Sequence, residues 1–309
     1  MSTDISPRTD LALEIREKYE KDNVEIKGVI INEEYIDKGK IKVSIVDIVN
    51  KNGASLMGRP IGRYITIENN VDKTKEVNIN ENSKLVNEDI QLKKVLIEHL
   101  QELTKNIKNK KILVVGLGNK DVTPDSLGPL VTEQIFATRH LIKEFGENFK
   151  KQNHIENIAA ISPGVMGQTG MEAKEIIQAI TKTVDINLVI VIDALAARSV
   201  SRLNCTFQIT NTGISPGSGV GNNRKALNQD SLGVPVIAIG VPTVVDAYTI
   251  VNDMLEQFML RQGFNDDEIN DFNMQLRNEN ILNMFVTPKD IDEAIKNISR
   301  IIAESINEF

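Results

Sequence analysis

Four short aliphatic runs in the second half of the chain constrain its fold most strongly. They cover residues 112–116, 158–162, 188–192 and 234–240, and loops and helical segments separate them. Strands that are buried on both faces of a parallel sheet have such runs, because helices cover both faces. The sequence therefore predicts an α/β fold over residues 110–309, with a mostly parallel sheet and helices on both of its faces.

The first 109 residues carry a different pattern. β-branched residues alternate or cluster in three segments, which we expect to be strands: residues 28–32, 40–48 and 63–67. The polar stretch 71–87 is typical of loops. Apolar residues at helical spacing predict amphipathic helices over 88–105, 172–181, 247–261 and 291–306. We expect residues 11–109 to extend the sheet of the parallel core.

Composition excludes several classes of protein. The 309 residues include 36 Lys and Arg against 43 Asp and Glu, a net charge of −7, which argues against nucleic-acid binding through phosphate contacts. No apolar run approaches the roughly 18 residues of a membrane span, and the N-terminus lacks the apolar segment of a signal peptide. We therefore expect a cytoplasmic protein with no membrane partner.

Cysteine and histidine are scarce. The single cysteine, Cys205, cannot form an internal disulfide, and none of the three histidines lies in a ligand-like pair. Zinc sites usually draw on several such residues. We therefore expect no metal and no other cofactor, and any catalytic acid or base is expected to be a carboxylate.

Three aspartates follow the aliphatic runs. Asp125 comes after the first run, Asp193 directly after residues 188–192, and Asp246 after the last run. Ligands bind at the carboxyl ends of strands in open α/β sheets. Burial raises the pKa of a carboxyl group, and a second carboxylate nearby raises it further. Such a pair can act as general base and general acid on one water.

The residues beside Asp125 suggest a division of roles. Thr123 is expected to cap the next helix, with Pro124 at its first position. Asp125 would then lie in the first turn, where the ionised form is favoured. Asp125 would act as the base while Asp193 holds the proton, although the reverse assignment is also open. Asp246 is equally typical of a helix N-cap.

Two other functions compete with this hypothesis. The three aspartates could instead hold a divalent cation, because carboxylates suit hard cations. The glycine-rich segments 116–118 and 217–221 could belong to a non-enzymatic nucleotide-binding module. However, Asp121 occupies the position of the third glycine in the dinucleotide fingerprint.

Seven motifs, in order, resemble the germination proteases of spore-forming bacteria. They are residues 8–14, 113–119, 122–129, 162–170, 192–198, 217–222 and 240–246. The resemblance implies an endopeptidase, made as a zymogen, that degrades the small acid-soluble proteins of the dormant spore when germination begins. It also implies a fold like that of hydrogenase-maturation proteases, a homotetramer, and a location in the cytoplasm of the forespore or spore core.

The resemblance also implies roles for particular residues. Asp125 and Asp193 match the two aspartates that are essential in the family. The family has been argued to be metallo or aspartic, and the scarcity of His and Cys favours the aspartic class. Apart from the resemblance, we expect supporting roles for Asp246 and for Arg198, which is placed one helical turn beyond Asp193. Arg198 could pair with an acidic substrate residue or form a structural ion pair. The loops of Gly118, Asn119 and Gly219 could stabilise an oxyanion.

The N-terminus resembles a substrate. Family substrates are cut after the acidic residue of a Thr-Glu-(Phe or Ile)-Ala-Ser-Glu site, and residues 9–14 have this layout, with Leu13 in place of serine. The resemblance implies self-cleavage between Asp10 and Leu11. Residues 1–10 would then be a propeptide and residues 11–309 the protease domain.

Overall fold

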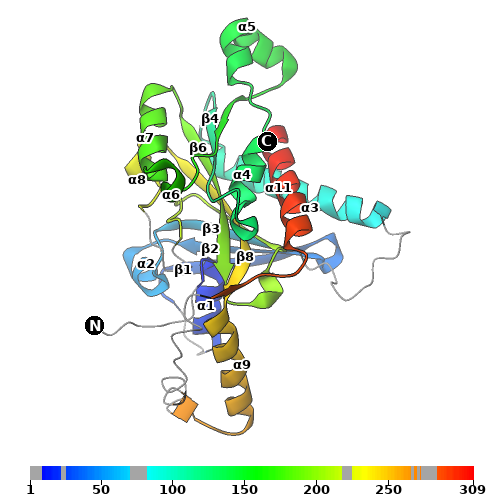
Figure 1. The fold of residues 1–309 in the computed structure, drawn as a ribbon, viewed down its shortest axis with the longest axis vertical. Helices are drawn as coiled ribbons and strands as arrows, with labels where there is room; N and C mark the ends of the chain where they lie inside the picture. Colours follow the sequence, from blue (N-terminus) through cyan, green and yellow to red (C-terminus); the bar gives the residue numbers. More distant parts are fainter. Residues whose placement is uncertain are drawn as a thin grey trace.

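A computed structural model describes residues 9–21, 26–69, 82–217, 225–265, 268–269, 272 and 284–309. Its strands form one sheet in the order β1-β2-β3-β7-β8-β6-β4-β5, and β9 pairs with β8 (Figure 1). The strands are β1 (Val29–Ile36), β2 (Ile41–Ile48), β3 (Gly62–Asn69), β4 (Lys111–Gly116), β5 (Asn157–Ile161), β6 (Leu188–Ala197), β7 (Thr206–Thr210), β8 (Val236–Asp246) and β9 (Phe285–Val286).

The sheet has a parallel and an antiparallel part. Strands β5, β4, β6 and β8 run parallel, so the predicted α/β core is confirmed. Strands β1, β2 and β3 form an antiparallel meander that joins this core through β7. Strand β7 was not predicted from the sequence.

The four predicted amphipathic helices are confirmed, and further helices accompany them among the described residues. The α-helices are α1 (Ala12–Lys21), α2 (Lys51–Met57), α3 (Asn82–Thr104), α4 (Leu127–Glu133), α5 (Arg139–Asn153), α6 (Met166–Thr169), α7 (Ala173–Thr183), α8 (Gln229–Leu232), α9 (Ala247–Arg261) and α11 (Ile291–Glu308). Of the further helices, α5 is as long as α9. Helix α3 begins at Asn82, so the expected loop over 71–87 was wrong for its last six residues. Within the described residues, no helix is both long and apolar enough to cross a membrane.

Helices cover both faces of the parallel part. Alternate residues of β4 point to opposite faces, as the pleat of a strand requires. Ile112 and Val114 belong to a buried cluster with α3, α4 and α11. Leu113 and Val115 belong to a second cluster with α7 and α8. Each fully buried aliphatic side chain contributes about 1.5–3 kcal/mol relative to exposure, so the two clusters hold helices against both faces of the parallel strands.

Candidate active site

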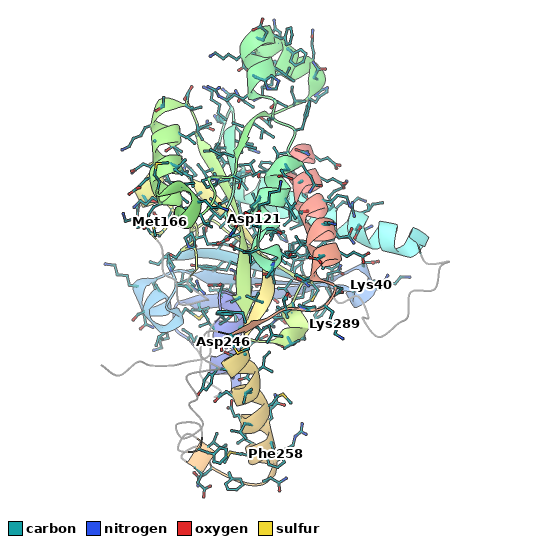
Figure 2. All side chains as sticks on the ribbon, in the orientation of Figure 1. Lys40, Asp121, Met166, Asp246, Phe258 and Lys289 are labelled. Atoms are coloured by element: carbon teal, nitrogen blue, oxygen red, sulfur yellow. The ribbon has the colours of Figure 1, made fainter. Side chains whose placement is uncertain are left out.

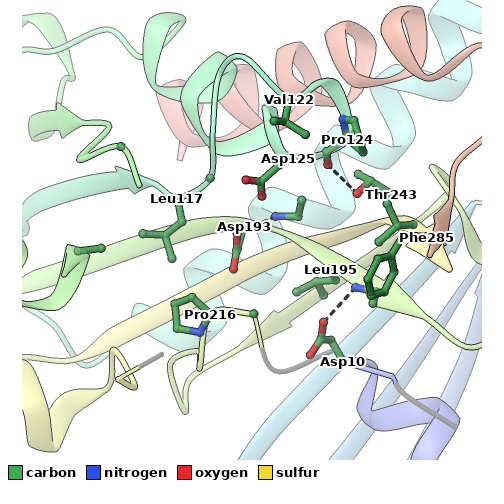
Figure 3. Close-up of a pocket in the computed structure, with 17 residues that line it drawn as sticks. Asp10, Leu117, Val122, Pro124, Asp125, Asp193, Leu195, Pro216, Thr243 and Phe285 are labelled. Carbon is green, nitrogen blue, oxygen red and sulfur yellow. Dashed lines mark hydrogen bonds between the residues drawn. The ribbon is translucent and has the colours of Figure 1, made fainter. Parts of the chain in front are cut away.

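A cavity of about 390 Å³ lies where the parallel strands end (Figure 3). The loop after β4 contributes Gly118 and Asp125, strand β6 contributes Asp193, and Asp10 of the N-terminal segment completes the lining together with residues of β8 and β9. β4 and β6 are parallel neighbours, and the last residue of β4, Gly116, pairs with Ile192, so the loop after β4 begins beside Asp193 of β6. The edge predicted for ligand binding therefore does hold a cavity.

Asp125 lies in a 3₁₀ turn, η3 (Thr123–Asp125), rather than in an α-helix. The expectation that Thr123 caps an α-helix was wrong, since Val122 precedes the turn without a side-chain cap and α4 begins at Leu127. The half-buried Asp125 carboxylate accepts a hydrogen bond of 2.8 Å from the backbone N–H of Asn119. Such bonds to a charged acceptor are stronger than neutral ones, so the loop after β4 fixes this carboxylate.

Glycine is required beside Asp125. Gly118 has φ of +112°, and a Cβ atom there would lie 2.0 Å from the carbonyl oxygen of Asp125. A side chain at this position would meet both backbone strain and a steric clash. Gly118 therefore shapes the loop that holds Asp125, and its expected part in an oxyanion site stays a prediction. The N–H of Asn119 donates to the Asp125 carboxylate.

Asp193 lies inside β6, which continues for four more residues to Ala197. Its side chain is buried, with 6% exposed, and one oxygen accepts the N–H of Ala194 at 3.0 Å. Figure 3 shows Asp125 and Asp193 directed into the same cavity from two different elements. The hydroxyl of Thr243 on β8 donates to the carbonyl of Pro124 at 2.7 Å and holds η3 against the sheet.

Two predicted supporting residues are engaged elsewhere. Asp246 lies where β8 meets α9 (Figure 2) and caps that helix by accepting the N–H of Thr249 at 2.9 Å. Arg198 follows the end of β6, not a helical turn, and its guanidinium pairs with Asp253 at 2.6 Å. Arg198 therefore forms the structural ion pair that the sequence left open.

The remaining supporting residue, Gly219, lies outside the described residues. Among the parts of the chain that the structure describes, no three Asp, Glu, His or Cys side chains are grouped as a metal site would require. Asp125 and Asp193 line the cavity without Asp246.

The N-terminal segment lies against β6 beside the two aspartates. The N–H of Asp10 donates to the carbonyl of Ala196 at 2.9 Å, and the N–H of Ala196 donates back to the Asp10 carboxylate at 3.0 Å. Leu11 is completely buried in an apolar cluster that includes Leu195, Leu203 and Val245. The bond predicted to be cut is therefore held at the cavity wall.

Gln208 contacts the N-terminal segment at this site, and no sequence pattern predicted it. Its side-chain amide donates to the carbonyl of Asp10 at 3.1 Å and accepts the N–H of Ala12 at 2.8 Å. It lies on β7, whose sequence Thr-Phe-Gln-Ile-Thr has the β-branched and aromatic alternation of a strand. That alternation was the available signal, but nothing in it reveals a contact with residues near the N-terminus.

A buried carboxylate anchors the start of α1. Glu14 accepts the backbone N–H groups of Arg198 at 2.7 Å and Ser199 at 3.0 Å, and it pairs with Arg202 at 3.2 Å. Burial lowers the pKa of Arg202, but Glu17, Glu68 and Glu14 outweigh this effect and raise the pKa above its usual value. The segment that follows Asp10 is thus fixed by charge as well as by apolar packing.

Comparisons with known proteins agree on one family. The family model described as germination protease matches residues 7–282. The chain is 44% identical to a germination protease of Caldanaerobacter subterraneus subsp. tengcongensis, over 97% of this chain and 93% of the relative. It is 42% identical to one of Clostridium perfringens, over 97% and 94% of the two chains, and 46% identical to one of Bacillus subtilis, over 83% and 68%.

A solved structure is also similar. It is a [NiFe] hydrogenase maturation protease of Thermococcus kodakarensis, with a TM-score of 0.34 and 16% identity, over 67% of this chain and 97% of that chain.

Proposed function

The chain belongs to the germination protease family, and on this premise we propose that Asp125 and Asp193 activate the water that its reaction requires. Membership makes the protein a hydrolase that acts on peptide bonds in spore germination. The observation that carries the proposal is that both carboxylates line one cavity together with Asp10.

The mechanism needs two carboxyl groups in different protonation states. One carboxylate takes a proton from water as the oxygen attacks the carbonyl carbon of the peptide bond. The other carboxyl group gives a proton to the departing nitrogen, and the C–N bond breaks. Because Asp193 is more deeply buried than Asp125, we assign the retained proton to Asp193 and the base to Asp125.

We propose further that this chain cuts itself between Asp10 and Leu11 and releases residues 1–10. Asp10 occupies the wall of the cavity and its backbone pairs with Ala196. While this segment is in place, a second polypeptide cannot pair with the same stretch of β6. The precursor would therefore be silent toward other proteins until the cut is made, as in a zymogen.

The substrates that fit the family and the N-terminal sequence are the small acid-soluble spore proteins. Residues 9–14 match their Thr-Glu-(Phe or Ile)-Ala-Ser-Glu site in layout, so a substrate would occupy the place that this segment holds. The cytoplasm of the forespore or spore core is the location that suits such substrates. A homotetramer is the proposed assembly.

Substitution of each aspartate tests the catalytic pair. Asp125→Asn and Asp193→Asn are each expected to slow self-cleavage by about 10²- to 10⁴-fold, the usual contribution of a general acid or base. The rate is measured by mass spectrometry and by sequencing the new N-terminus, which should be Leu11. Asp230→Asn, at an exposed position on α8, is the matched control and should process normally.

A chelator distinguishes the metal alternative in the same assay. Self-cleavage of the unsubstituted chain is expected to continue at an unchanged rate in EDTA. Loss of cleavage that Mg²⁺ or Mn²⁺ restores would instead support a metal held by the aspartates. Normal processing by either Asp→Asn variant would refute the assigned pair.

A further inference from the structure

We propose that Gln208 is a catalytic residue of this reaction, which binds the backbone on both sides of the cut bond and stabilises the oxyanion that forms on the carbonyl of Asp10. This inference rests on the proposed cut between Asp10 and Leu11. It adds a residue on β7 to a site that the two aspartates do not complete, because an oxyanion also needs a hydrogen-bond donor.

The two hydrogen bonds of Gln208 bracket the bond. The Nε2 atom donates to the Asp10 carbonyl oxygen at 3.1 Å, and the Oε1 atom accepts the Ala12 N–H at 2.8 Å. A backbone carbonyl can only accept and a backbone N–H can only donate. The partners therefore fix the orientation of the Gln208 amide. Because its oxygen accepts the N–H of Ala12, its NH₂ group faces the carbonyl of Asp10.

Gln208 and the aspartates reach the bond from different cavities. Gln208 lines a second cavity of about 100 Å³ that also includes Arg59 and Tyr64. Asp10 and Leu195 line both this cavity and the one that holds Asp125 and Asp193. A water activated by the aspartates would approach the carbonyl carbon from the larger cavity, while Gln208 contacts the oxygen from the smaller one.

The position of Gln208 makes it a preorganised donor. The side chain is buried, with 8% exposed, and its residue pairs with Thr66 of β3 on one side and Gly240 of β8 on the other. A central strand of the sheet thus holds its backbone. Donors fixed in advance in a site with little water stabilise developing charge far better than mobile donors in solution.

The proposed step balances without a further reactant. Water oxygen bonds to the Asp10 carbonyl carbon, one aspartate takes the water proton, and the carbonyl electron pair moves onto the oxygen that faces Gln208. When the pair returns, the bond to the Leu11 nitrogen breaks, and the other aspartate protonates that nitrogen. Gln208 supplies a hydrogen bond throughout and transfers no proton.

The contacts of Gln208 are made to backbone atoms, so they do not depend on which side chains flank the bond. Any extended peptide presents a carbonyl and, two residues later, an N–H. We therefore expect Gln208 to act in the same way on a protein substrate once residues 1–10 have left and Leu11 and Ala12 have moved away from Gln208. The acidic residue before the cut would then take the place of Asp10.

Two substitutions in the full chain test the role. Gln208→Met keeps the length of the side chain but removes both hydrogen bonds, and it should slow appearance of the Leu11 N-terminus by about 10²-fold, as for loss of one oxyanion donor. Gln208→Glu should be at least as slow near neutral pH, where a carboxylate cannot donate. Gln178→Ala, which removes an amide donor to the Ser231 carbonyl on α8, is the control and should cut normally.

The pH profile separates a catalytic from a structural role. Below the pKa of the introduced acid, the carboxyl group of Gln208→Glu can donate a hydrogen bond again. Its rate relative to the unsubstituted chain should therefore rise as the pH falls, whereas the relative rate of Gln208→Met should stay flat. Flat profiles for both variants would overturn the proposal, and so would self-cleavage at or above the unsubstituted rate, which would make Gln208 a latch that restrains the segment.

A peptide assay gives a second measurement that does not depend on self-cleavage rates. The processed chain is given Thr-Glu-Ile-Ala-Ser-Glu and the same peptide N-methylated at Ala, which lacks the N–H for Gln208. The unsubstituted enzyme should cut the methylated peptide about tenfold more slowly, and Gln208→Met should cut both equally. If N-methylation slowed the unsubstituted enzyme and Gln208→Met by the same factor, the proposal would be overturned. Failure of the proposed catalytic pair would appear separately, as normal cutting by the Asp125→Asn variant.

Discussion

Single atoms decide how closely the loop of Asp125 lies against the sheet. Gly118 has a positive φ, and a Cβ in place of one of its Hα atoms would lie 2.0 Å from the carbonyl oxygen of Asp125. Gly116 approaches the backbone of Gly128 equally closely, because a Cβ added to Gly116 would lie 2.0 Å from the carbonyl oxygen of Gly128. Glycine at these positions lets the turn of Asp125 and the start of α4 contact the end of β4 directly.

Gly118→Ala is expected to misplace Asp125. The strain of a positive φ costs about 1–3 kcal/mol, and the clash also displaces the loop that holds Asp125. The rate of self-cleavage should therefore fall by more than the loss of folding stability alone would cause. Gly233→Ala is the matched control: its φ is +77° but nothing lies within 4 Å of an added Cβ. Unfolding curves should show a loss in both variants, and N-terminal sequencing should show slow cleavage only in Gly118→Ala.

Asp125 and Asp193 could be proposed from the sequence but Gln208 could not, for a physical reason. Both aspartates come after short aliphatic runs, and the direction of parallel strands brings such positions to one edge of the sheet. Gln208 acquires its role through contacts with residues 10 and 12, which are 198 and 196 positions away. No local pattern encodes that pairing.

At the scale of elements, α1 is positioned by one arginine. Arg202 contacts Glu14, Glu17 and Glu68, and only 2% of the Glu14 side chain is exposed. Helix α1 follows Leu11 directly, so these ion pairs determine where the segment before it lies. Helices α3, α7, α9 and α11 were predictable because each carries apolar residues at helical spacing. Strand β7 and the ends of β6 and β8 were not, because polar residues interrupt their aliphatic pattern.

Arg202→Met should destabilise the protein by about 3–5 kcal/mol, because it leaves the Glu14 carboxylate buried without its cation. Amide hydrogen exchange should show the loss of protection first in α1. Self-cleavage should also produce more than one new N-terminus. Lys93→Met, which breaks a surface pair with Glu308, should cost no more than about 1 kcal/mol. Similar losses in the two variants would contradict the anchoring role of Arg202.

On the scale of the whole molecule, one sheet links the N-terminal strands to the catalytic edge. Strand β3 pairs with β7, and β7 pairs with β8. The aliphatic patterns predicted both parts of this sheet, but they contain no information about strand order, which is set by long-range pairing through the unpredicted β7. We therefore expect residues 11–109 to unfold together with residues 110–309.

Ile65→Ala tests this coupling. Ile65 is fully buried on β3, and its truncation should cost about 2–5 kcal/mol. Hydrogen exchange should show the same fall in the free energy of unfolding for amides of β2 and of β4. If protection fell only in β1, β2 and β3, the N-terminal strands would be an independent folding unit.

Complete burial of Leu11 bears on the direction of the reaction. Its N–H now donates to the Thr9 hydroxyl at 3.0 Å, and that threonine would depart with the released decapeptide. Hydrolysis there would create an ammonium and a carboxylate in the protein interior, where each unpaired ion costs several kcal/mol. The two new charged chain ends would therefore move out into water. The free energy of rejoining them would then be unfavourable, and activation would be irreversible.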